Sequence, residues 1–167
     1  MKHKFLYVCA VTLCAATATF AQASAEKMTI TGTCPKPDVQ QSVPAGDKDG
    51  HTFTLEQGKC TAEGKIGSAA AKDGVYATHG DATATRSKAS GIYAETMDSG
   101  DKVFYTYTET VMLKDGAPQS GSNTYQIAGG TGKMKGIKGS GTCKLTPTGD
   151  GGLKYSCVGT YTMGAAQ

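Results

Sequence analysis

The residues best suited to chemistry lie in the run 102–113. One face of this run carries the apolar and aromatic residues Val103, Tyr105, Tyr107 and Val111 at alternate positions, and Glu109 lies among them on the same face. If that face lines a protein interior, desolvation raises the pKa of the Glu109 carboxyl group. Such a group could act as a general acid or base. In the alternative interpretation, Glu109 is solvated at a rim or on an outer face, and the sequence leaves both open.

Four of the six cysteines follow a predicted signal peptide: Cys34, Cys60, Cys143 and Cys157. Four cysteines allow three pairings. Cys143 and Cys157 are centred on the turn-forming run 148–152, so they would oppose each other across a hairpin, close to disulfide geometry. Cys34 then pairs with Cys60. A zinc site is the competing interpretation, but the chain has no C-x-x-C motif.

The other chemical motifs are incomplete. In the glycine-rich run, Lys133 is followed by Met134 rather than Ser or Thr, so it does not match a phosphate loop. No serine has Gly at both second neighbours, and residues 47–50 lack the closing Glu of a calcium loop. We therefore expect no metal, no cofactor and no catalytic triad, with His51 and His79 as ordinary loop or strand residues.

The first 25 residues have the order of a signal peptide. Lys2 and Lys4 precede an apolar stretch that ends in Ala23-Ser24-Ala25, a small-x-small cleavage site. Cleavage after Ala23 is the second choice. The sequence predicts an exported protein, in the periplasm or outside the cell, with residues 26–167 as a single domain. No later segment is apolar enough to predict a membrane span.

Charge after the predicted cleavage site is nearly balanced. Fifteen basic residues face fourteen acidic ones, because two of the seventeen Lys and Arg lie before residue 26. Nucleic acid binding depends on neutralising phosphates with basic side chains. The composition therefore gives no case for a nucleic acid partner.

Periodicity indicates an all-β protein. Alternating runs are separated by turn residues, and no window carries a helical repeat. The pattern predicts an antiparallel meander of eight or nine strands closed as a β-barrel, with a sandwich as the alternative. A surface loop is expected at 35–50, and hairpin turns at 72–74, 98–101 and 114–116. The expected strands are 27–33, 51–57, 59–66, 74–86, 91–97, 102–113, 121–128, 135–145 and 153–163.

Residues 129–142, GGTGKMKGIKGSGT, resemble a glycine-rich pattern of the allene oxide cyclase-like and dirigent-like barrel family. The run follows a tyrosine-containing strand and precedes two final strands, as in that family. Met134 stands where the family usually has an aromatic residue. The resemblance implies an eight-stranded calycin-type barrel with room for an apolar ligand, often a homotrimer, and it implies no activity for this chain.

Three functions are compatible with these patterns. The first is binding of an apolar or amphipathic small molecule inside the barrel, lined by Tyr105, Tyr107, Glu109 and Tyr125. The second is a cofactor-independent isomerase or cyclase that uses Glu109 as acid or base. The third is a structural or interaction protein of the cell envelope whose barrel is packed solid. Whether the protein is an enzyme is therefore left open.

Overall fold

The computed structural model describes residues 24–164, so the predicted signal peptide lies almost wholly outside the described residues. Apart from the short helix η1 (Gly132–Met134), the regular structure is β. The strands are β1 (Glu26–Cys34), β2 (Val39–Pro44), β3 (Thr52–Ile66), β4 (Ala69–Ala82), β5 (Arg86–Met97), β6 (Lys102–Lys114), β7 (Ala117–Gly130), β8 (Lys138–Pro147) and β9 (Leu153–Thr162).

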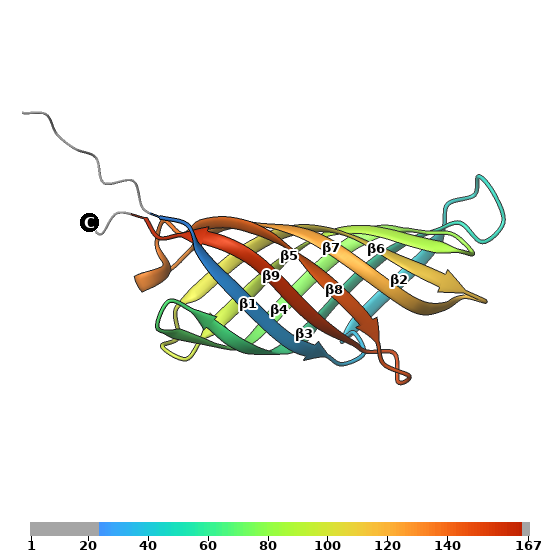
Figure 1. Ribbon diagram of the computed structural model, residues 1–167. Coiled ribbons are helices and arrows are strands. Elements are labelled where there is room, and N and C mark those ends of the chain that lie inside the picture. The colour runs from blue at the N-terminus through green and yellow to red at the C-terminus, as the bar shows by residue number, and fades with distance from the viewer. Residues whose placement is uncertain (1–23, 165–167) are drawn as a thin grey trace, which may run out of the picture.

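Eight of these strands close into an antiparallel barrel, as the periodicity predicted (Figure 1). From β3 to β9, each strand pairs with the next in the chain. β1 pairs with β9 on one side and with β3 on the other, which closes the cylinder. β2 lies outside the closed circuit and pairs with β3 alone among the described strands.

Two expectations about the N-terminal half were wrong. The segment 35–50 contains β2, whose residues are all exposed, so it shows no inward-outward alternation that a sequence could reveal. The expected strands 51–57 and 59–66 are one strand, β3, because Gly58 stays in the ladder opposite Tyr76.

One predicted hairpin turn was also wrong. The turn before β4 lies at Gly67, which has a positive φ, rather than at residues 72–74. Gly74 is instead a paired strand residue, opposite Cys60 on one side and Glu95 on the other. The turns near residues 98–101, 114–116 and 148–152 are confirmed.

The two ends of the barrel differ. The end that carries both ends of the described chain is filled by apolar side chains, and Met134 and Ile137 of the glycine-rich segment pack there with Ile66, Met97 and Val103. In that segment Gly132 and Gly136 have positive φ, which lets the chain fold across the opening. The connection between β7 and β8, residues 131–137, is therefore the glycine-rich lid of the closed end, whereas the rest of the glycine-rich run lies in β7 and β8.

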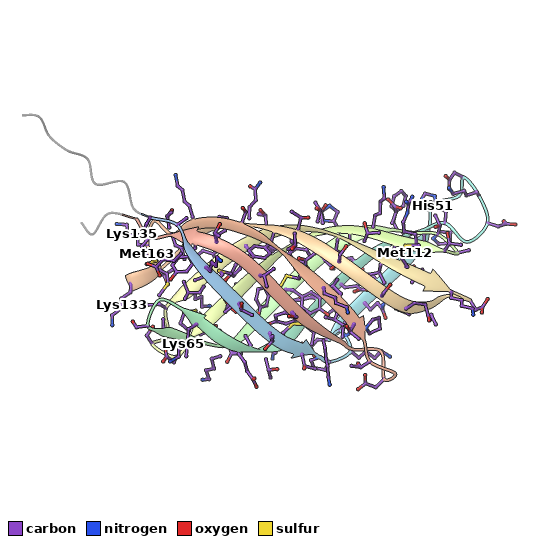
Figure 2. The ribbon with its side chains drawn as sticks, in the orientation of Figure 1. His51, Lys65, Met112, Lys133, Lys135 and Met163 are labelled. Atoms are coloured by element: carbon purple, nitrogen blue, oxygen red, sulfur yellow. A yellow bond between two sulfur atoms is a disulfide. The ribbon has the colours of Figure 1, made fainter. Side chains whose placement is uncertain are left out.

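At the opposite end, the wall is uneven. The first residues of β3 pair with β2 instead of β1, and the first residues of β7 extend past the part that pairs with β8. Figure 2 labels His51 and Met112 toward this end, whereas Lys133 and Met163 lie at the closed end. The open end is the approach to the interior.

Tyrosine rings lie against glycines on the inner wall. A Cβ built on each of these glycines would come within 3 Å of a tyrosine ring or hydroxyl atom. Each tyrosine therefore occupies space next to the backbone of a neighbouring strand that a side chain on the glycine would otherwise fill. The pairs are Tyr76 with Gly58, Tyr93 with Gly74, Tyr107 with Gly91, Tyr125 with Gly141 and Gly159, and Tyr155 with Gly32.

We predict that Gly91→Ala destabilises the barrel. The new Cβ would lie 2.6 Å from the Tyr107 ring and 2.8 Å from the Ala77 carbonyl oxygen, which a strand cannot easily move. Overpacking of this kind costs about 1–3 kcal/mol of unfolding free energy. Urea unfolding measures the loss, and Gly149→Ala, which meets nothing within 4 Å, is the control. Equal stability of the two variants would contradict the packing argument.

The join between β1 and β3 is the shortest pairing around the cylinder. Only Ile30–Thr33 of β1 pairs with Thr61–Gly64 of β3, and the disulfide Cys34–Cys60 follows at once. The second disulfide, Cys143–Cys157, lies within the fully paired β8–β9 hairpin. Both disulfides have the pairing expected from the sequence.

Removing the first disulfide should therefore open the join. For the double variant Cys34→Ala/Cys60→Ala we predict a loss of about 2–5 kcal/mol of unfolding free energy. Backbone amides of residues 30–33 and 61–64 should also lose protection from hydrogen exchange. Cys143→Ala/Cys157→Ala is the matched control and should leave protection at the join in place. Unchanged exchange at the join in the first variant would contradict this account.

Candidate functional site

A cavity of about 130 Å³ lies in the barrel interior. Its lining includes six tyrosines, three glutamates and both disulfides. Thr78, Asn123 and a few aliphatic side chains complete it. The tyrosines are Tyr76, Tyr93, Tyr105, Tyr107, Tyr125 and Tyr155, and the glutamates are Glu56, Glu95 and Glu109.

The four residues predicted to line an interior all border this cavity: Tyr105, Tyr107, Glu109 and Tyr125. The face of β6 that carries Val103 and Tyr105 points inward, since both residues are buried. Glu109 lies on the same face, partly buried. Of the two orientations that the sequence left open, the Glu109 side chain therefore has the one that faces the interior. Its role in binding or catalysis stays a prediction.

Glu95 is the most deeply buried carboxyl group of the site, and it was not among the residues predicted from the sequence. Only 1% of its surface is exposed. The Tyr105 hydroxyl donates a hydrogen bond of 2.6 Å to Glu95 Oε2. The signal was available, because Tyr93, Glu95 and Met97 alternate with Ile92, Ala94 and Thr96 as the β6 residues do.

Burial perturbs both inner carboxyl groups. Desolvation raises the pKa of Glu95 from 4.5 to about 7, against the opposing effect of the Tyr105 hydrogen bond. Burial likewise raises the pKa of Glu109 to about 7, and the negative charge of Glu56 adds to the shift. Both groups therefore change protonation state near neutral pH.

The tyrosine hydroxyls form a neutral network around these groups. The hydroxyls of Tyr93 and Tyr155 lie 3.3 Å apart, and Tyr155 also donates to the carbonyl oxygen of Thr61 at 3.1 Å. Burial raises the pKa of Tyr125 and of Tyr155 to about 12. These hydroxyls stay protonated at neutral pH and serve as hydrogen-bonding groups.

Three buried polar atoms at the cavity have no hydrogen-bond partner among the described residues. They are Glu95 Oε1, Asn123 Oδ1 and the Tyr125 hydroxyl oxygen. All three residues line the same cavity. A buried polar group without a partner costs about 1–3 kcal/mol, so unpaired atoms gathered in one place need an explanation.

The described residues contain no cluster of three or more His, Cys, Asp or Glu side chains placed to hold a metal ion. His51 lies at the open end, where its Nδ1 is 2.6 Å from Asp47 Oδ1 in an exposed contact. His79 is exposed on β4 and does not line the interior cavity. Within residues 24–164, no helix is long and apolar enough to cross a membrane.

We predict that the protein becomes less stable as pH rises from about 4.5 to about 7. Because the folded-state pKa of Glu95 lies above its ordinary value of 4.5, the native state binds more protons than the unfolded state between these two values. The contribution of Glu95 to the free energy of unfolding is complete below pH 4.5 and declines until the pH exceeds about 7. The expected loss from Glu95 is roughly 3 kcal/mol.

Denaturation of the Glu95→Gln variant between about pH 4 and pH 8.5 measures this effect. The variant should show a flatter pH dependence than the wild type. Glu63→Gln, which changes an exposed residue of β3, is the control and should follow the wild type. Parallel curves for Glu95→Gln and wild type would show that Glu95 does not titrate as its burial implies.

Comparison with known proteins adds no function: no protein-family model matches this chain, and no curated protein matches it.

Proposed function

We propose that the barrel binds a small molecule with an apolar body and a polar group in its interior. The observation that carries the proposal is the convergence of unpartnered polar atoms of Glu95, Asn123 and Tyr125 on one cavity. Binding sites of this kind combine apolar and aromatic walls with a few placed polar groups. A barrel packed solid for a structural role would have no reason to keep these atoms unpaired.

The size of the cavity limits what it can hold. A cavity of about 150 Å³ accepts benzene in an engineered protein, and the volume here is about 130 Å³. The buried part of the ligand is therefore a single ring or a group of similar bulk. Any longer part would extend toward the open end, where Tyr76, Leu153 and Tyr155 are partly exposed.

The cellular setting belongs to the same proposal. Two disulfides favour an oxidising compartment, in keeping with the predicted signal peptide and export. Membership of the allene oxide cyclase-like family and a homotrimer stay predictions that rest on the residue 129–142 resemblance.

A titration with cyclohexanol tests the proposal. The chain has no Trp, so the emission of the cavity tyrosines reports directly on the interior. We expect a saturable, one-to-one change in tyrosine fluorescence and matching heat in calorimetry. Thr78→Phe, which puts a ring into the cavity, should abolish binding, and Val75→Phe on the outer face should not. Binding that survives Thr78→Phe in a folded variant would place the ligand elsewhere.

A second function, proton transfer, is favoured by one observation: Glu109 borders the cavity with a pKa of about 7, where a general base works best. Exchange of the α-hydrogens of cyclohexanone in deuterated water, followed by NMR, tests it. The protein should accelerate exchange, and Glu109→Gln should lower the rate by about 10²–10⁴-fold. Exchange no faster than in buffer would remove the catalytic function.

A further inference from the structure

The charges that line the cavity have one sign. Glu56, Glu95 and Glu109 contribute carboxyl groups from β3, β5 and β6, and no Lys, Arg or His is among the lining residues. The interior therefore has a negative potential whenever these groups are ionised. A carboxylate or phosphate ligand would meet repulsion without a compensating cation.

One of the three carboxyl groups has a hydrogen-bond partner within the protein at only one of its two oxygens. Glu95 Oε2 accepts the Tyr105 hydroxyl, whereas Glu95 Oε1 has no partner among the described residues and belongs to a side chain that is 1% exposed. An ionised carboxylate accepts hydrogen bonds and donates none. When Glu95 is ionised, the group that completes Oε1 is a donor, and a positively charged donor gives the strongest bond.

Aromatic rings surround this carboxyl group. The ring centroids of Tyr105 and Tyr125 lie 5.6 Å apart, and those of Tyr93 and Tyr105 lie 5.9 Å apart. Rings this close together pack against one another, edge to face for Tyr105 and Tyr125, and form one aromatic wall of the cavity. A ring face on that wall attracts a cation. The ring faces and the carboxylates thus both favour a positively charged ligand.

From this arrangement we infer that the interior site is selective for organic cations, namely a protonated amine on a compact apolar body. A primary or secondary ammonium would donate to Glu95 Oε1, with Tyr105 and Tyr125 beside it, and the apolar body would fill the rest of the cavity. The inference rests on the proposed function, since it names the ligand class of that same site.

The binding should depend on pH through the same carboxyl groups. Neutral tyrosines interact with Glu95 from four strands: Tyr93 from β5, Tyr105 from β6, Tyr125 from β7 and Tyr155 from β9. On β4, which also pairs with β5, the acidic Asp73 acts on Tyr93. Around Glu109, the charge of Glu56 from β3 and the hydroxyls of Tyr76 and Tyr107 complete the set. None of these groups is basic, so protonation of Glu95 and Glu109 at low pH removes their attraction for a cation and leaves the weaker attraction of the ring faces.

Three probes with the same cyclohexyl body test the inference: cyclohexylamine, cyclohexanol and cyclohexanecarboxylate. At about pH 8.5 we expect the amine to bind at least about tenfold more tightly than the alcohol, and the carboxylate not to bind. The amine should lose about tenfold or more in affinity at about pH 5.5, where the amine remains protonated but Glu95 and Glu109, with pKa values of about 7, are mostly neutral. Tyrosine fluorescence and calorimetry measure all three.

Glu95→Gln keeps the shape of the side chain and removes its charge. This variant should bring the affinity for the amine down to that for the alcohol while leaving the alcohol itself bound. Glu63→Gln, on the outer face of the same barrel, should keep the tenfold preference. Glu109→Gln is the second test should Glu95→Gln fold poorly, and it should reduce the preference for the amine in part.

The outcomes separate the two levels of the proposal. If the alcohol binds as tightly as the amine in the wild type, or if the carboxylate binds, the cation inference is wrong and the interior binding site stands. If none of the three probes binds at either pH, both the binding site and its charge preference are wrong. A preference for the amine that survives Glu95→Gln and Glu109→Gln would place the cation at another surface.

Discussion

The short join between β1 and β3 is the constraint on which the rest of the structure depends. A meander of antiparallel strands has two free edges until its first and last members meet. Here the circuit closes only because β1 reaches β3 along four residues and the Cys34–Cys60 disulfide fixes the contact. Closure turns one face of every barrel strand into an interior. Without it, Glu95 and the tyrosines would line an open sheet, where water would pair their polar atoms and the carboxyl pKa values would return toward 4.5.

The interior is the product of two sequence features that act together. Tyrosines lie opposite or beside glycines, so their rings lie over the neighbouring strand, and apolar side chains together with the glycine-rich lid fill only the closed end. A chain with leucines at the tyrosine positions would fill the middle with aliphatic side chains and leave no hydroxyl groups there. The same rings lower the local dielectric around Glu95 and Glu109. The packing of the interior, the raised pKa values of Glu95 and Glu109 and the proposed ligand preference thus all follow from the tyrosines that lie against glycines.

Much of this was predictable from the residues, for physical reasons that differ between elements. The inward face of β6 followed from strict alternation, and Cys143–Cys157 followed from symmetry about a strong turn. β2 could not be predicted, because both of its faces are exposed and its pairing is set by the length of β3. Glu95 carried the same alternation signal as Glu109, but the strand expected around Glu95, residues 91–97, was shorter than the strand expected around Glu109, residues 102–113. The turn at Gly67 was misplaced because Lys72-Asp73-Gly74 has turn chemistry in sequence, while the strand accommodates it with a bulge.

The central claim is that a compact cation enters the barrel and contacts its aromatic wall. Intermolecular nuclear Overhauser effects between cyclohexylamine and the assigned tyrosine ring protons test it most directly. The account predicts contacts from the cyclohexyl protons to the rings of Tyr105 and Tyr125, which disappear in Thr78→Phe. Contacts confined to exposed outer side chains such as Ile92 and Phe104, with none to the inner tyrosines, would contradict it.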